Sequence, residues 1–234
     1  MRCKMLGLVP EAMRRHDLVY LHPAAAFTTP CAVSGDPFWQ AAADWIAGGR
    51  PLVAARQPVA GGPLMLGLSL PLAQQRKKLS IHVERSALAE ISAPLSIARC
   101  CPRLPAAEGD VLRQLAAEAV ACSARLGVFG SLAWEVLSGE DYRHAESDID
   151  LICDVETLTQ FDVMLAALQR AAGQLSCRLD GEIRFPDGNA VAWREVAAYR
   201  ACPAAAVLVK GPHEVSLQPL QVLLASLKEE PCHA

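Results

Sequence analysis

The sequence predicts an α/β protein of the α+β kind, with a mixed sheet flanked by helices preceded by a smaller, strand-rich N-terminal domain. In the first half, eight prolines between Pro10 and Pro71 favour short strands and turns over long helices. In the second half, strand-like apolar runs alternate with segments of helical periodicity. The pattern changes near Pro105–Gly109. We therefore expect one domain over residues 1–107 and a second over residues 108–234.

The first half contains apolar runs of the length and alternation that strands need. The clearest is Leu79–Glu84, where every second residue is apolar. A helical turn is expected at Ser86–Glu90, and irregular or extended structure at Ala93–Leu104 because two prolines lie at its end. The predicted strands are Pro51–Ala55, Leu64–Leu70 and Leu79–Glu84.

The second half alternates strands and amphipathic helices. Asp110 is a plausible N-cap for its first helix, and Pro186–Asn189 is a strong turn signal between two strands. The predicted helices are Asp110–Cys122, Ser131–Leu137, Leu158–Leu175 and Leu217–Leu227. The predicted strands are Arg125–Phe129, Ser147–Val155, Cys177–Phe185, Ala190–Val196 and Val207–Lys210.

Composition excludes several classes of protein. A hydrophobic content of 52% with 20% charged residues is typical of a folded globular chain. The net charge of −3 provides no general attraction to nucleic acid, and no apolar run approaches the roughly 18 residues of a membrane span. Nine cysteines occur without a Cys-x-x-Cys pair, so we expect reduced thiols in a cytoplasmic protein.

The stretch from Val128 to Cys153 carries the chemistry. Gly130 and Ser131 form a turn between a strand and a helix, where backbone N–H groups and the helix dipole attract phosphate. Asp148 and Asp150 are two residues apart on a strand and therefore share a face. Their repulsion is best tolerated where a divalent cation lies between them. Metal-binding carboxylates beside a phosphate site predict the transfer of a phosphoryl or nucleotidyl group.

A third carboxylate is expected from the string RLDGEIRF. Here Arg178, Asp180, Glu182 and Arg184 alternate with apolar residues. Such a face is also typical of a solvated strand with ion pairs. Either Asp180 or Glu182 would complete the metal site, with a slight preference for Asp180.

Basic side chains are expected to neutralise the substrate phosphates. The candidates are Arg178, Arg184, Arg194 and Lys210. For Arg194 the alternative is an ion pair with Glu195 or Glu182, and for Lys210 it is a plain surface position. The six histidines have no metal-binding spacing, and Trp134 and Trp193 are expected to pack in the core.

The order of strand, Gly-Ser turn, helix and Asp-x-Asp strand resembles the nucleotidyltransferase fold shared with DNA polymerase beta. The long spacing between Ser131 and Asp148 predicts an inserted loop at Gly139–Glu146. The chain as a whole resembles the malonate decarboxylase holo-acyl-carrier-protein synthases, also called phosphoribosyl-dephospho-coenzyme A transferases. The strings that carry this resemblance are RRHDLVYL, RPLVAARQ, LGLSLPL, QRKKLSI, VFGSLAWEVLSG, SDIDL, RLDGEI and PDGNAVAWREV. Tyr20 and Glu135 depart from the family pattern, which favours Trp and Gln there.

The resemblance implies a defined reaction. The family transfers phosphoribosyl-dephospho-coenzyme A from 2'-(5''-triphosphoribosyl)-3'-dephospho-coenzyme A to a serine of the apo acyl-carrier subunit of malonate decarboxylase, and pyrophosphate leaves. It implies Asp148 and Asp150 as the catalytic, Mg²⁺-binding residues, and a first domain that binds the precursor or the carrier. The basic run Arg76–Lys78 would then steer an acidic carrier by charge, unless it is merely a solvated loop. The equivalent synthase for citrate lyase, and a nucleotidyltransferase acting with a nucleoside triphosphate on another acceptor, are the alternatives.

Overall fold

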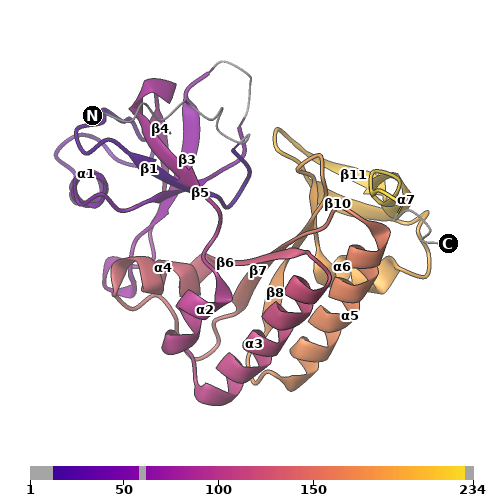
Figure 1. Cartoon of the computed structure of the whole chain (residues 1–234). Helices are drawn as coiled ribbons and strands as arrows, with labels where there is room; N and C mark the ends of the chain where they lie inside the picture. Colours follow the sequence, from indigo (N-terminus) through magenta and orange to yellow (C-terminus); the bar gives the residue numbers. More distant parts are fainter. Residues whose placement is uncertain (1–12, 58–61, 230–234) are drawn as a thin grey trace, which may run out of the picture.

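Two sheets organise the chain in the computed structural model, which describes residues 13–57 and 62–229 (Figure 1). The first sheet has the order β4-β3-β2-β1-β5, with antiparallel pairs throughout. The second has the order β11-β10-β9-β8-β7-β6, in which β7 and β8 run parallel and the other neighbours antiparallel. The first-sheet strands are β1 (Leu18–Leu21), β2 (Leu52–Ala54), β3 (Leu64–Ser69), β4 (Lys78–Val83) and β5 (Leu88–Ser92). Those of the second are β6 (Arg125–Phe129), β7 (Ile149–Asp154), β8 (Leu179–Arg184), β9 (Ala190–Ala192), β10 (Ala206–Lys210) and β11 (Val215–Pro219).

The first sheet buries one face against helix α1 (Pro37–Ala47). Trp45 and Ile46 of the helix pack with Leu66 and Ile81 of the sheet. This helix was not predicted, because prolines in the first half were expected to break helices. Pro37 instead occupies the first turn, where a missing N–H costs nothing, behind the capping side chain of Asp36. The other face of the sheet carries Val53, Gly67, Ser69 and Lys78, and is only partly covered.

The second sheet packs one face against α3 (Ala106–Ala121), α5 (Leu158–Gln174) and α6 (Trp193–Tyr199). Figure 1 shows α3 and α5 side by side across strands β6–β8. Leu151, Cys153 and Ile183 point toward these helices and are buried. Since side chains alternate along a strand, Asp150, Asp154 and their neighbours point to the opposite face. That opposite, polar face is the one turned toward the first sheet. The helices α4 (Gly130–Ser138) and α7 (Leu220–Leu224) complete this half.

The change between the two cores lies near Pro94 rather than at residue 107. Residues expected to be irregular form the helical turns α2 (Ile97–Cys100) and η3 (Cys101–Arg103). Their buried side chains Ile97, Cys100 and Cys101 belong to the second core. Other short turns are η1 (Leu72–Gln74) and η2 (Arg85–Ala87).

Several predicted boundaries were wrong. α3 begins at Ala106, so Asp110 lies in its second turn and pairs with Arg113 instead of capping. The strand expected to reach Val196 stops at Ala192, because Trp193 and Val196 are buried on α6. The helix expected from Leu217 is preceded by β11 and spans only Leu220–Leu224. The strands β1 and β5 were not predicted.

Candidate active site

A cavity of about 600 Å³ lies between the two sheets. Its walls come from both halves of the chain. Gly67, Ser69 and Lys78 belong to the first sheet, whereas Gly130 and Asp150 belong to the second half. Pockets of about 300–1,000 Å³ are typical sites for small molecules and cofactors. The predicted Gly-Ser and Asp-x-Asp motifs therefore meet at one cavity.

The turn from β6 into α4 requires glycine at position 130. Gly130 has φ = +71°, a left-handed conformation that side chains disfavour. A Cβ atom at this position would lie 2.0 Å from Oδ2 of Asp150. The Asp150 carboxylate thus rests directly against the backbone of the turn, with Ser131 beginning the helix beside it.

Asp148, Asp150 and Asp180 form an acidic cluster. The parallel register of β7 and β8 pairs Asp150 with Asp180. Arg178 lies 3.1 Å from Asp180 and 3.7 Å from Asp148. Burial, followed by repulsion from Asp180 and Asp148, raises the pKa of Asp150 from 3.8 to about 6. One carboxylate of the cluster is therefore held at high energy when ionised.

The cluster fits a divalent cation by its chemistry. Within residues 13–57 and 62–229, no three His, Cys, Asp or Glu side chains are arranged as a ready-made metal centre. The three carboxylates nonetheless offer oxygen atoms alone, which suits Mg²⁺, and a cation between them would remove the repulsion that acts on Asp150. Asp180, beside Asp150, is the better placed of the two candidates for the third ligand.

Glu182 lies in an ion-pair network and not among the metal-ligand candidates. Its carboxylate accepts two hydrogen bonds from Arg15, at 3.1 and 3.2 Å, and one from Lys210 at 2.8 Å, and His16 lies 3.4 Å away. Burial opposes ionisation of Glu182, but the hydrogen bond from His16 and the charges of Arg15 and Lys210 hold its pKa well below the usual range. A carboxylate with these partners is occupied by the protein itself.

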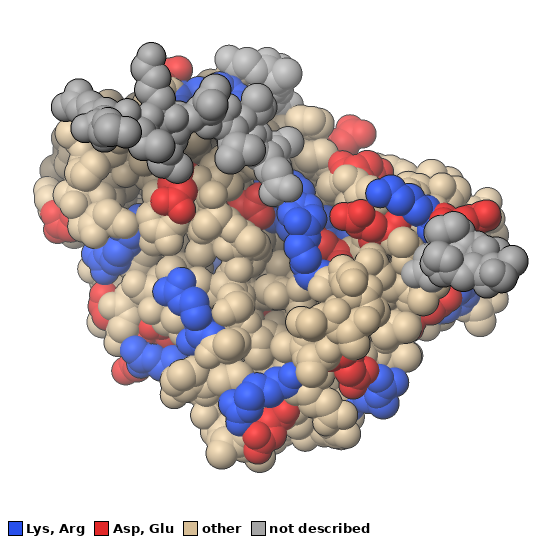
Figure 2. All heavy atoms as spheres, viewed as in Figure 1, with Lys and Arg blue, Asp and Glu red and all other residues tan. Residues whose placement is uncertain are grey.

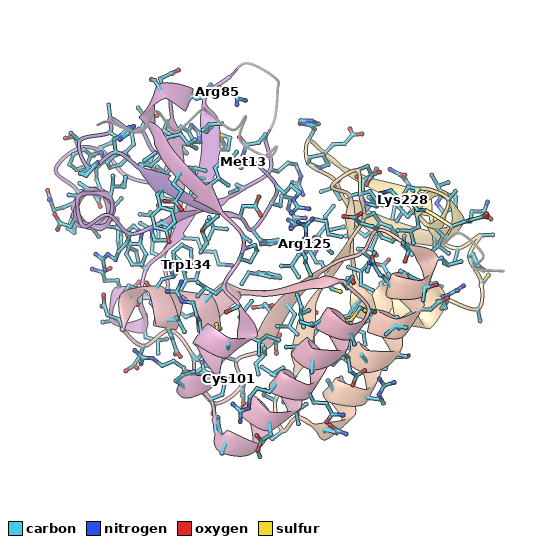
Figure 3. The ribbon with its side chains drawn as sticks, in the orientation of Figure 1. Met13, Arg85, Cys101, Arg125, Trp134 and Lys228 are labelled. Carbon is cyan, nitrogen blue, oxygen red and sulfur yellow. The ribbon has the colours of Figure 1, made fainter. Side chains whose placement is uncertain are left out.

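The segment Arg14–Asp17 crosses the polar face of the second sheet. Arg14 lies 3.4 Å from Asp154, and the buried Arg184 pairs with the same carboxylate at 2.5 Å. Arg184 also donates to the carbonyl of Arg15. Arg125 reaches toward Asp154 from β6 on this same side of the sheet (Figure 3). These contacts join the N-terminal segment to the second sheet beneath the cavity.

His16 lies at the cavity wall, although no histidine was predicted to have a role. Its ring stacks on Phe129, the residue before Gly130, with 3.8 Å between ring centroids. Burial, the largest influence, lowers its pKa, so the ring is neutral at pH 7. Its backbone has φ = +72°. The signal that could have drawn attention to His16 was the charged string Arg14–Asp17 directly before a buried strand.

The basic residues predicted to bind phosphate do not gather at one point. Arg178 lies beside the acidic cluster, Lys210 is held by Glu182, and Arg184 is buried under Arg15. Arg194 is on the helix-covered side, where it donates to the carbonyl of Leu179 and lies over the ring of Trp193. Neither of the carboxylates proposed as its alternative partners pairs with it.

The predicted insertion after α4 forms a loop that closes the cavity. Buried Glu135 accepts hydrogen bonds from the backbone of Tyr142 and Arg143 and from the Arg143 side chain. Burial opposes ionisation of Glu135, but these hydrogen bonds lower its pKa. The Tyr142 hydroxyl donates to the carbonyl of Ser69 in the first sheet at 3.0 Å. The loop thereby connects the two halves.

Both tryptophans proposed as packing residues are buried. Trp134 lies between α4 and the first sheet (Figure 3), where it meets Trp45 edge to face and also lines the cavity. Basic and acidic side chains are interspersed on the face in Figure 2, with no extended patch of one sign among the residues described there.

Comparison with known proteins decides the family. The model for the phosphoribosyl-dephospho-CoA transferase MdcG N-terminal domain matches residues 14–94, and the model for the C-terminal domain of the same transferase matches residues 94–221. The chain belongs to the phosphoribosyl-dephospho-CoA transferase family. It is accordingly a transferase.

Relatives named phosphoribosyl-dephospho-CoA transferase share most of the chain's length. One from Xanthomonas axonopodis pv. citri is 36% identical over 211 residues, which cover 89% of this chain and 95% of the relative. One from Bradyrhizobium diazoefficiens is 32% identical, covering 78% and 81%. One from Pseudomonas fluorescens (strain Pf0-1) is 31% identical, covering 86% and 91%. No solved structure matches this transferase.

The two family models agree with the division of the transferase into two cores. They meet at residue 94, where the chain leaves the first sheet and enters the second core. The N-terminal match begins at Arg14, the first residue of the segment that pairs with the second sheet. In the described part of this family member, no helix combines the length and apolar character needed to cross a membrane.

Proposed function

We propose that this transferase moves the phosphoribosyl-dephospho-coenzyme A group from 2'-(5''-triphosphoribosyl)-3'-dephospho-coenzyme A to a serine of the apo acyl-carrier subunit of malonate decarboxylase. The observation that carries the proposal is the contact of the Gly130–Ser131 turn with the Asp150 carboxylate at an inter-sheet cavity. This is the arrangement of phosphate turn and paired carboxylates expected for a nucleotidyltransferase site.

The reaction is a displacement at phosphorus. The serine Oγ attacks the phosphorus atom attached to the ribosyl group, and its proton is lost. The bond from that phosphorus to the bridging oxygen breaks, so a phosphodiester forms and pyrophosphate leaves. No covalent intermediate with the protein is required.

The chain's own groups have distinct tasks in this proposal. Asp148, Asp150 and Asp180 would hold Mg²⁺, which when bound would neutralise charge on the phosphates. The N–H groups at the start of α4 bind the outgoing pyrophosphate, with Ser131 beside them. Arg178 holds Asp148 and Asp180 in place until the cation and substrate arrive.

Mass spectrometry of the apo carrier subunit tests the proposal. The carrier is incubated with the transferase, Mg²⁺ and the triphosphoribosyl precursor, and we expect its mass to rise by one phosphoribosyl-dephospho-coenzyme A group. Asp148→Asn and Asp150→Asn should abolish the shift, as should EDTA. Asp162→Asn, which alters an exposed pair with Arg200 on α5, should leave it unchanged.

Other outcomes would redirect the assignment. A shift on the citrate lyase carrier but not on the malonate decarboxylase carrier would make the protein the citrate lyase synthase. Transfer of label from ATP or another nucleoside triphosphate would indicate a different donor. Transfer at normal rates by Asp150→Asn would refute the assigned carboxylate role.

We further propose that the enzyme acts in the cytoplasm. All seven cysteines within the described residues are free, and four of them are at least partly exposed. Free thiols of this kind persist in a reducing compartment.

A further inference from the structure

The basic run Arg76–Lys78 is divided by the backbone. Gln75 and Arg76 adopt φ values of +59° and +53°, two consecutive left-handed residues that turn the chain sharply into β4. As a result, Arg76 and Lys78 line the inter-sheet cavity. Lys77 does not line it, and its ammonium lies 5.6 Å from the ring centre of Phe38 in α1. Three adjacent cations therefore have two different surroundings.

The cavity has walls of opposite charge. Lys78 pairs with Ser69 at the edge of the first sheet, and both residues line the cavity. Asp148 and Asp150 line it from the second sheet. The charge of Lys78 acts on Asp150 by lowering its pKa against the larger effects of burial and repulsion, so the two groups are electrostatically in reach.

Arg76 and Lys78 are the lysine and arginine side chains among the described residues that line this cavity. Neither has a carboxylate within 4.0 Å in the described part of the chain, unlike Arg178, Lys210 and Arg15. Cations without a protein partner, facing an acidic cluster across a cavity, have the charge and position for an anion that lies between the two walls.

We propose that Arg76 and Lys78 bind the triphosphate of the substrate, so that the first half of the chain supplies the cationic wall of the active site. This inference rests on the proposed function and names the residues for one part of its substrate. The guanidinium of Arg76 can donate two hydrogen bonds to phosphate oxygens, and Lys78 supplies a point charge. The triphosphate then lies between these side chains and the Gly130–Ser131 turn. The expected steering of the carrier by the whole run is replaced by a role in substrate binding.

Binding of inorganic tripolyphosphate to the full chain, measured by titration calorimetry with Mg²⁺ present, tests the proposal. A charged hydrogen bond contributes enough that Arg76→Ala and Lys78→Ala should each weaken binding by about 10-fold or more. Lys77→Ala is the matched control from the same run and should change affinity by less than about twofold. All three side chains are exposed, so the melting temperatures should stay near that of the unaltered chain.

Steady-state transfer to the carrier provides the second readout. Arg76→Ala and Lys78→Ala should raise KM for the precursor and leave KM for the carrier unchanged. The proposal is overturned if the unaltered chain does not bind tripolyphosphate, if Lys77→Ala is as damaging as the other two, or if only the carrier KM rises.

The two levels of inference fail separately. If tripolyphosphate binding depends on Arg76 and Lys78 but no carrier is modified, the phosphate site stands and the proposed function is wrong. If the carrier is modified normally by Arg76→Ala and Lys78→Ala at low precursor concentration, the function stands and the phosphate site is wrong.

Discussion

Replacing Asp150 by Asn should stabilise the protein while abolishing transfer. The reason is the electrostatic cost of ionising this carboxylate in the folded chain. Asp150 is mostly buried, lies against Gly130, and faces two other carboxylates. Asn keeps the shape of the side chain and removes the charge, so the repulsion disappears together with the metal ligand.

The size of the effect follows from the change in the pKa of Asp150 on folding. Folding raises this pKa from 3.8 to about 6. A difference of one pH unit between the two pKa values corresponds to about 1.4 kcal/mol, so ionised Asp150 costs the folded state about 3 kcal/mol. Because the pKa is raised, the cost is nearly absent below the unfolded pKa and is complete above the folded one. It should be about half its full size near pH 5 and complete near pH 8.

Chemical unfolding followed by tryptophan fluorescence measures this difference. The free energy of unfolding of Asp150→Asn minus that of the unaltered chain should grow between pH 5 and pH 8, in buffer without divalent ions. In a chain of this size, a gain of 1 kcal/mol raises Tm by about 2–4 °C. Added Mg²⁺ should stabilise the unaltered chain and not the variant, since binding to the folded state alone raises its stability.

A variant that is equally stable or less stable at pH 8 would refute the reasoning, and so would a difference that does not depend on pH. Asp162→Asn serves as the control, because it alters an exposed carboxylate and should change stability by no more than about 0.5 kcal/mol.

Three further substitutions test the architecture around the cavity by the free energy of unfolding. Gly130→Ala should lower it by about 1–3 kcal/mol and abolish transfer, because the new methyl group meets Asp150. Gly173→Ala, in open space on α5, should instead raise it by up to about 1 kcal/mol, and equal effects of the two would contradict the close approach. Glu182→Gln should lower it by about 3–5 kcal/mol, since its buried cationic partners lose their carboxylate; a neutral result would show that water replaces it. Tyr142→Phe should lower it by about 0.5–1.5 kcal/mol and speed proteolysis of the loop after α4, and unchanged proteolysis would argue against the loop's attachment to the first sheet.

Local chemistry made the centre of the site predictable. The strand β6 was predicted with its observed ends, and α4, β7, α5 and β8 within two residues at each end. These elements carry clear periodicity and distinct turn residues, so their positions follow from neighbours along the chain. The first half was predicted less well. α1 begins with a proline, and β1 and β5 are short strands whose partners lie far away in sequence.

The choice between Asp180 and Glu182 illustrates what alternation alone leaves open. Both side chains point to the same face of β8, so the sequence could not separate them. The parallel register places Asp180 beside Asp150, whereas Glu182 lies about 6.6 Å further along the strand, beneath Arg15. Pairing between strands and contact with a segment 167 residues away decide their different surroundings.

The sequence by itself determined the family, the Gly-Ser turn, the carboxylates and most elements of the second half, because each depends on residues close together in the chain. Only the tertiary structure decided what faces them. It placed His16 against Phe129, and Arg76 and Lys78 across the cavity from Asp150. The physical reason is that a cavity between two sheets is formed by surfaces distant in sequence, and their meeting depends on buried ion pairs and packing that no local pattern records.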